Sequence, residues 1–193
     1  MTSEREKQMW RGAYEWVRAL IRAVLAVVIL FTFVGRMTRV DGESMRETLQ
    51  DGDLLAVLNA SWCGTYEAGD LVILQKDGFH DGEPIVKRVI ATEGQTVDID
   101  FTRGEVFVDG ALLEEPYVRE PTWTAEGEEF PLTVPEGCLF VMGDNRNDSD
   151  DSRNPELGPV DSRQVLGRAV FLVLPGETAE LGRQEWSRIG ILD

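Results

Sequence analysis

The most constraining feature of this sequence is an apolar run near its N-terminus. Residues 13–35 are mostly apolar, and residues 23–31 contain no polar side chain. With Arg18 and Arg22 reaching back toward the lipid headgroups, the run approaches the ~20 residues that cross a bilayer. Trp10, Tyr14 and Trp16 lie where an interfacial aromatic belt would form. We therefore expect a membrane anchor, residues 13–35, after a short N-terminal segment, residues 1–12.

Two other readings of this run are a cleavable signal peptide and a buried core helix. A signal peptide ends in small residues around its cleavage site, whereas bulky residues follow this run at positions 31–40. A core helix is usually shorter and less continuously apolar. Both alternatives stay open, but the sequence favours an uncleaved anchor.

Charge is distributed unevenly along the chain. Residues 1–39 hold seven basic and three acidic side chains, a net charge of +4, so the remainder carries −20 of the total of −16. Because basic flanks stay in the cytoplasm, we expect a single-pass protein with its N-terminus in the cytoplasm and residues 36–193 on the extracytoplasmic side. The acidic total argues against a nucleic-acid partner.

Residues beyond the anchor read as a β domain. Short runs rich in β-branched residues alternate with Gly and Asp, and Asp-Gly pairs recur between them, as at Asp109-Gly110. No long stretch shows a helical period. The predicted fold is mainly β: an antiparallel, partly closed, barrel-like domain behind one N-terminal transmembrane helix. The strands are expected within residues 53–59, 70–75, 84–92, 96–101, 105–113, 138–144 and 168–175.

The cysteine and histidine content gives little sign of a metal site. Cys63 and Cys138 are the two cysteines, and an exported domain could either join them or keep both as buried thiols. His80 is the single histidine, and no CxxC pattern is present. We expect neither a metal nor a cofactor.

Ser44 is a candidate nucleophile that needs a base from elsewhere in the chain. His80 lies between two Asp-Gly turns, as expected for an exposed loop, so a Ser–His–Asp triad is disfavoured. An S-x-x-K motif would need lysine where the chain has Glu47. Neither template supplies a base for Ser44.

Lysine usage points to Lys87. The chain has sixteen arginines but three lysines, and Lys87 lies inside the apolar strand "PIVKRVIAT". If it faces inward, burial and neighbouring Arg88 would both lower its pKa toward that of a base active near neutral pH. The alternative is an edge-strand lysine that faces solvent.

Four blocks of the sequence, in order, resemble the bacterial type I signal peptidases, which are membrane-anchored Ser–Lys proteases. The blocks are "GESMRETL" at 42–49, "GDLVIL" at 69–74, "VKRVIATEGQTV" at 86–97 and "MGDNRNDSDDSR" at 142–153. Each is weak alone, but their order behind an anchor is specific. The resemblance implies a serine endopeptidase that removes signal peptides from exported preproteins, cleaving after small residues at positions −1 and −3.

The resemblance also assigns roles to residues. Ser44 would be the nucleophile, with its backbone N–H in the oxyanion hole, and Lys87 the general base. Ser149 would orient the lysine ammonium. Gly42 stands where some family members have a second serine. The positions that would brace the site are Asp144, Arg146, Asp151 and Arg153.

The resemblance further implies the surroundings of the site. Substrate pockets would be lined by Val40, Met45, Leu49, Ile85 and Val86, for which ordinary core packing is the alternative. Residues of about 98–138 would form a minimal accessory β region. The partners would be signal-peptide-bearing preproteins and membrane lipid, close to the secretion translocon in the cytoplasmic membrane.

Some positions depart from the family pattern. Glu47 stands where a proline is usual, and Thr92 and Glu93 replace the more usual Gly and Pro. A self-cleaving repressor-like protease is disfavoured by the anchor and by the lack of a DNA-binding segment. A silent, partner-binding β module is disfavoured because Ser44, Lys87 and Ser149 are all present.

Overall fold

The computed structural model describes residues 2–178 and 182–192. The chain forms two compact units, residues 1–36 and residues 37–193. The first unit is the helix α1 (Thr2–Ile29), which continues as the π-helical turn η1 (Leu30–Val34). Among the described residues, the helical stretch Trp10–Val34 is the one long and apolar enough to cross a membrane. The limits set for the anchor, residues 13–35, lie almost entirely within this stretch and stay a prediction.

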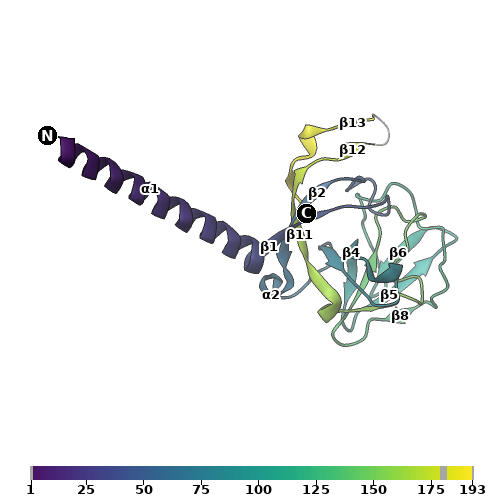
Figure 1. The fold of residues 1–193 in the computed structure, drawn as a ribbon. Coiled ribbons are helices and arrows are strands. Elements are labelled where there is room, and N and C mark those ends of the chain that lie inside the picture. Colours follow the sequence, from purple (N-terminus) through teal and green to yellow (C-terminus); the bar gives the residue numbers. More distant parts are fainter. Residues whose placement is uncertain (1, 179–181, 193) are drawn as a thin grey trace. The chain divides into compact units, whose positions relative to one another are not determined.

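The second unit is built on one large antiparallel sheet that curls into a half-barrel (Figure 1). Its strands, in spatial order, are β1 (Gly35–Arg39), β2 (Leu54–Asn59), β11 (Val165–Leu174), β3 (Leu71–Leu74), β4 (Ile85–Thr92), β9 (Cys138–Met142) and β10 (Val160–Asp161), with β14 (Gly190–Ile191) beside β11. Register shifts in the β11–β2 and β4–β9 pairs mark bulges, which bend a sheet. The predicted antiparallel, partly closed β fold is confirmed.

A smaller sheet continues from β4. Its strand order is β7 (Ala111–Leu112), β6 (Glu105–Val108), β5 (Thr96–Asp100) and β8 (Leu132–Thr133). The β6–β7 hairpin turns at Asp109 and Gly110, whose φ angles of 52° and 78° suit a tight hairpin turn. This turn was expected from the Asp-Gly pair.

Short elements complete the second unit. The strands β12 (Glu177–Thr178) and β13 (Arg183–Gln184) form a two-stranded ribbon. The helical turns are α2 (Ala60–Cys63), η2 (His80–Gly82), η3 (Ser162–Gln164) and η4 (Trp186–Arg188). Both cysteines are free thiols.

The apolar core covers both faces of the central strands. In β3, Leu71 and Ile73 pack with Met45 and Leu49 on one side, and Val72 and Leu74 belong to a second cluster on the other. A strand buried on both faces has no room for alternating polar residues, which explains the continuous run "LVIL". The neighbouring strand β4 is also buried over most of its length, so most of its side chains lie in packed surroundings.

Gly167 in β11 is a point of close approach between strands. A Cβ there would lie 2.2 Å from the carbonyl oxygen of Leu58 and 2.8 Å from Cγ1 of Val57. We expect Gly167→Ala to lower the free energy of unfolding by about 1–3 kcal/mol, because the β2 backbone must move. Gly190→Ala is the matched control, since nothing lies within 4 Å of its Cβ position. Thermal unfolding of the detergent-solubilised protein measures both; equal melting temperatures would contradict the expectation.

Candidate active site

Ser44 lies on the loop between β1 and β2. The base of this loop is closed by hydrogen bonds from Val40 N to Asp53 O (2.8 Å) and from Gly52 N to Val40 O (2.9 Å). Met45, next to the serine, is buried in the apolar core. The loop is thus fixed by the hydrogen bonds at its base and by the packing of Met45. Ser44 lines an open cleft.

Lys87 meets Ser44 across this loop. It lies within β4, is 3% exposed, and its Nζ is 2.7 Å from Ser44 Oγ. Burial lowers the pKa of Lys87 from 10.5 to about 8, against the raising effect of Asp151, Asp150 and Glu126. The solvent-facing alternative for this lysine is excluded by its burial.

Arg153 also lowers the pKa of Lys87. The same effect expected of the sequence neighbour Arg88 stays a prediction. Successive side chains of a strand point to opposite faces, and Arg88 is directed to a different partner. Its Nε and one terminal nitrogen donate to the two carboxylate oxygens of Asp144, each at 2.9 Å. Thr48 Oγ1, on the Ser44 loop, also donates to Asp144. This buried pair ties β4 to the loop.

Gly143 allows the chain segments of the site to meet. A Cβ at this position would lie 2.2 Å from Ser149 Oγ and 2.5 Å from Ser44 O. Just beyond it, Asn145 N donates to Ser44 O (3.0 Å) and Asn145 Nδ2 donates to Glu43 O (3.1 Å). The segment after β9 therefore lies directly against the serine loop.

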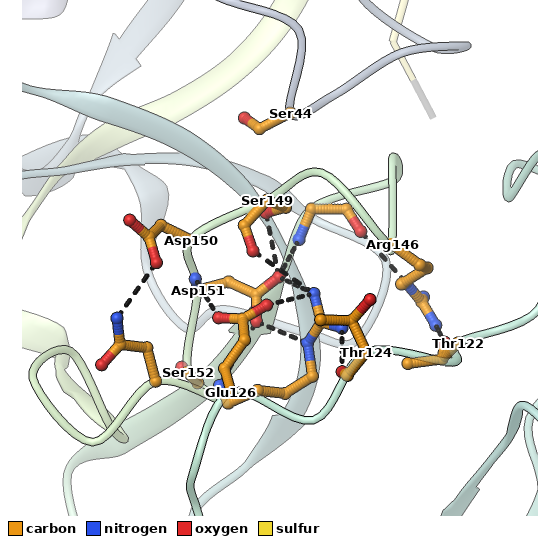
Figure 2. Close-up of polar contacts among 12 residues, drawn as sticks. Ser44, Thr122, Thr124, Glu126, Arg146, Ser149, Asp150, Asp151 and Ser152 are labelled. Carbon is orange, nitrogen blue, oxygen red and sulfur yellow. Dashed lines mark hydrogen bonds and ion pairs between the residues drawn. The ribbon is translucent and has the colours of Figure 1, made fainter. Parts of the chain in front are cut away.

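Asp151 is the centre of a buried polar network below Ser149. Its carboxylate accepts hydrogen bonds from Gly143 N (2.9 Å), from Ser149 Oγ (2.9 Å) and from two nitrogens of Arg153 (2.8 Å each). Figure 2 shows Ser149, Asp151 and Glu126 within one connected set of contacts, with Ser44 to one side. Among the described residues, no hydrogen bond joins Ser149 directly to Lys87. The role expected for Ser149 stays a prediction.

Two carboxylates of the site were missed by sequence reasoning. Arg146 pairs with Glu115 and also donates to Thr122 Oγ1 (3.1 Å), while Arg153 pairs with Glu126 at 3.0 Å. Buried arginines require acidic partners, and this was the available signal. The sequence did not indicate which acidic residues of the polar stretch, residues 114–129, would pair with these arginines.

The cleft beside Ser44 has a volume of about 770 Å³. Its walls are formed by residues 38–45, 83–87 and 147–150, together with His80, Thr124 and Glu126. Of the expected pocket residues, Val40, Met45, Ile85 and Val86 line it, whereas Leu49 is fully buried in the core. His80 is exposed, and its Nε2 lies 3.3 Å from Asp150 Oδ2. Glu47 points instead toward Arg119, 3.6 Å away.

Comparison with known proteins identifies the family of this chain. A family model for signal peptidases, peptidase S26, matches residues 13–174. The chain belongs to the signal peptidase I family. Signal peptidase I of Bacillus licheniformis is 38% identical, over 91% of this chain and 96% of its own length. Signal peptidase I S of Bacillus subtilis (strain 168) is 32% identical, over 86% and 91%.

A solved signal peptidase I from Enterococcus faecalis V583 is 31% identical. It covers 54% of this chain and 96% of its own, with a TM-score of 0.45.

The Arg88–Asp144 pair generates a prediction for this signal peptidase. Asp144→Asn removes the countercharge of a buried guanidinium, and we expect it to lower the free energy of unfolding by about 3–5 kcal/mol. Asp148→Asn, on the same loop but exposed, is the control and should change it by less than about 0.5 kcal/mol. Thermal or denaturant unfolding distinguishes the two. A loss no larger than that of the control would mean that the pair contributes little.

Proposed function

We propose that Ser44 and Lys87 form the catalytic dyad of this signal peptidase I. The family supplies the reaction, which is removal of signal peptides from preproteins by a serine protease. The observation that carries the residue assignment is the 2.7 Å contact between Ser44 Oγ and Lys87 Nζ. A hydroxyl next to a buried amine with a lowered pKa is the arrangement that makes a serine nucleophilic.

The mechanism follows from this contact. Neutral Lys87 takes the proton of Ser44 as Oγ attacks the scissile carbonyl, and the resulting ammonium gives a proton to the leaving amine. Water then hydrolyses the acyl-enzyme, with Lys87 again as the base. The Ser44 N–H donates no hydrogen bond to any of the described residues, which supports its assignment as an oxyanion donor.

Ser149 is proposed to orient the ammonium of Lys87. Its proton is donated to Asp151, so the lone pairs of its oxygen are left for a donor on the cleft side. Asp151 is fixed in turn by Arg153, and Arg146 braces the same segment through its bond to Gly143 O (3.0 Å). Asp144 acts from the other side of β4 through Arg88.

Substrate selection is proposed to follow from the apolar part of the cleft. Val40, Met45, Ile85 and Val86 leave shallow space that suits small side chains at positions −1 and −3, and larger ones would overlap with them. Leu49 supports Met45 from the core. Preproteins with Ala-x-Ala before the cleavage site are the expected substrates.

The location proposed for the enzyme is the cytoplasmic membrane. Residues 13–35 would cross the lipid, with residues 1–12 in the cytoplasm and residues 36–193, including a minimal accessory β region at about 98–138, on the extracytoplasmic side. The basic N-terminal flank supports this orientation. Such an anchor holds the site close to membrane-bound preproteins as they leave the secretion translocon.

Loss of either member of the dyad tests the mechanism. Ser44→Ala and Lys87→Arg should each reduce cleavage of an Ala-x-Ala precursor by at least about 10³-fold, since arginine keeps the charge but does not act as a base. Ser61→Ala and Lys76→Arg are the matched controls and should retain activity. Full activity in either dyad variant would reject the Ser–Lys mechanism.

The pH dependence tests the protonation state of the base. Only the neutral amine accepts a proton, so kcat/KM should rise with pH through about 8, the pKa of Lys87, and level off above it. Initial rates of precursor cleavage between pH 5 and 10 measure this profile. A rate that still rises without levelling off at pH 10 would show that the pKa of the base is not lowered from the ordinary lysine value of 10.5 to about 8.

A further inference from the structure

Glu126 is a cleft carboxylate that the proposed mechanism does not use. It belongs to the polar stretch before β8 and lines the same cleft as Ser44 and Lys87. Its side chain is 13% exposed, although most acidic side chains stay in water. A carboxylate that is kept out of water beside a catalytic lysine calls for a reason.

The contacts of Glu126 join it to the network below Ser149. Oε1 lies 3.0 Å from a terminal nitrogen of Arg153, and Oε2 accepts a hydrogen bond from Asp151 N at 3.4 Å. The same Arg153 nitrogen donates to Asp151 Oδ2 at 2.8 Å. Arg153 is therefore shared by the carboxylates of Glu126 and Asp151, which Figure 2 shows within the same set of contacts. Only one of these carboxylates, Glu126, faces the cleft.

Glu126 also acts on Lys87 through its charge. Burial and nearby Asp151 raise the pKa of Glu126 to about 7, and an ionised Glu126 in turn raises the pKa of Lys87. Arg153 has the opposite effect on Lys87, which Glu126 offsets. The other charged or titratable groups that line the cleft are Arg39, Asp41, Glu43, His80, Glu83, Asp148 and Asp150.

Among the acidic neighbours of Lys87, Glu126 is the one best placed for control. Asp151 is fully buried and its oxygens are occupied by Gly143, Ser149 and Arg153. Asp150 is exposed, accepts from Asn154 Nδ2 (3.0 Å) and lies beside His80, so solvent screens its charge. Glu126 is largely shielded from solvent and can ionise. It belongs to the stretch before β8, not to the β1–β2 loop or to β4, which carry Ser44 and Lys87.

We propose that Glu126 is a positioning residue for the reaction. Its carboxylate holds Arg153 against Asp151 and stabilises the ammonium form of Lys87, so that this segment contributes to the pH at which the dyad becomes active. The inference rests on the proposed dyad and deepens it. It assigns a role in the site to Glu126, a residue that the sequence did not single out.

The direct test follows the Lys87 amine by NMR. Because the chain has three lysines, selective ¹³C labelling of lysine gives at most three side-chain signals, and Lys87→Arg assigns one of them. In Glu126→Gln, the titration midpoint of Lys87 should fall by about half a pH unit or more, since a stabilising negative charge is lost and Arg153 is less neutralised. This readout needs no cleavage, so it stays informative if the proposed function fails.

Kinetics provide the second readout. The acid limb of kcat/KM should move to lower pH by the same amount, which raises the rate on that limb about threefold. Glu126→Asp keeps the charge and should restore at least half of the shift. Glu129→Gln is the matched control: it removes the same charge from an exposed site in the same segment and should leave Lys87 unchanged.

Two results would overturn the proposal. One is a titration midpoint of the Lys87 amine that is the same in Glu126→Gln as in Glu129→Gln. The other is a midpoint that moves to higher pH. A third result would separate the two proposals. If the titration midpoint of Lys87 falls in Glu126→Gln as expected, but Ser44→Ala retains cleavage, the Ser–Lys dyad is rejected and the effect of Glu126 on Lys87 stands.

Discussion

The contact between Ser44 and Lys87 depends on keeping one amine out of water. A lysine in solvent is charged at neutral pH and cannot accept a proton from serine. Here β4 places Lys87 where it is 3% exposed, and burial lowers its pKa to about 8. Three features place Lys87 there. Apolar clusters bury both faces of the neighbouring strand β3, a register shift bends the β4–β9 pair, and the loops pack closely around Gly143. The proposed dyad therefore depends on the packing around Lys87 as much as on the two side chains themselves.

Arginine supports the site because it does not compete for the proton. Arg88, Arg146 and Arg153 are buried, and each is paired with at least one carboxylate. A guanidinium stays charged throughout the working range of the enzyme, so it fixes geometry without titrating. The scarcity of lysine in this chain fits this difference between the two residue types. The buried arginines keep their charge, whereas Lys87 is the buried basic residue whose protonation state is proposed to change during the reaction.

Much of this architecture could be predicted from sequence because it depends on local patterns. The apolar run, the β-branched strands and the Asp109-Gly110 hairpin are each encoded within a few residues. Lys87 was identified because a charged side chain is unusual within a strand whose other residues are mostly apolar. The order of four short blocks then brought Ser44 and Lys87 into one family pattern, and the observed distance agrees with it.

What could not be predicted is which distant acids complete the network. Glu115 and Glu126 lie in a polar stretch with no motif, and many other acids of the chain look the same in sequence. Their selection depends on tertiary placement of Arg146 and Arg153. Likewise, the lowering effect of Arg153 on the pKa of Lys87 could not be predicted, because the two residues are far apart in the sequence.

The pairing of Arg146 and Arg153 with Glu115 and Glu126 has a consequence for biosynthesis. Ser44 and Lys87 precede Glu115, Glu126 and Arg153 in the chain, so the residues of the network are synthesised after both of them. A chain truncated before residue 153 would carry Ser44 and Lys87 without the buried network around Asp151. The order of elements therefore means that the Ser44–Lys87 pair acquires its supporting network only after residue 153 has been synthesised.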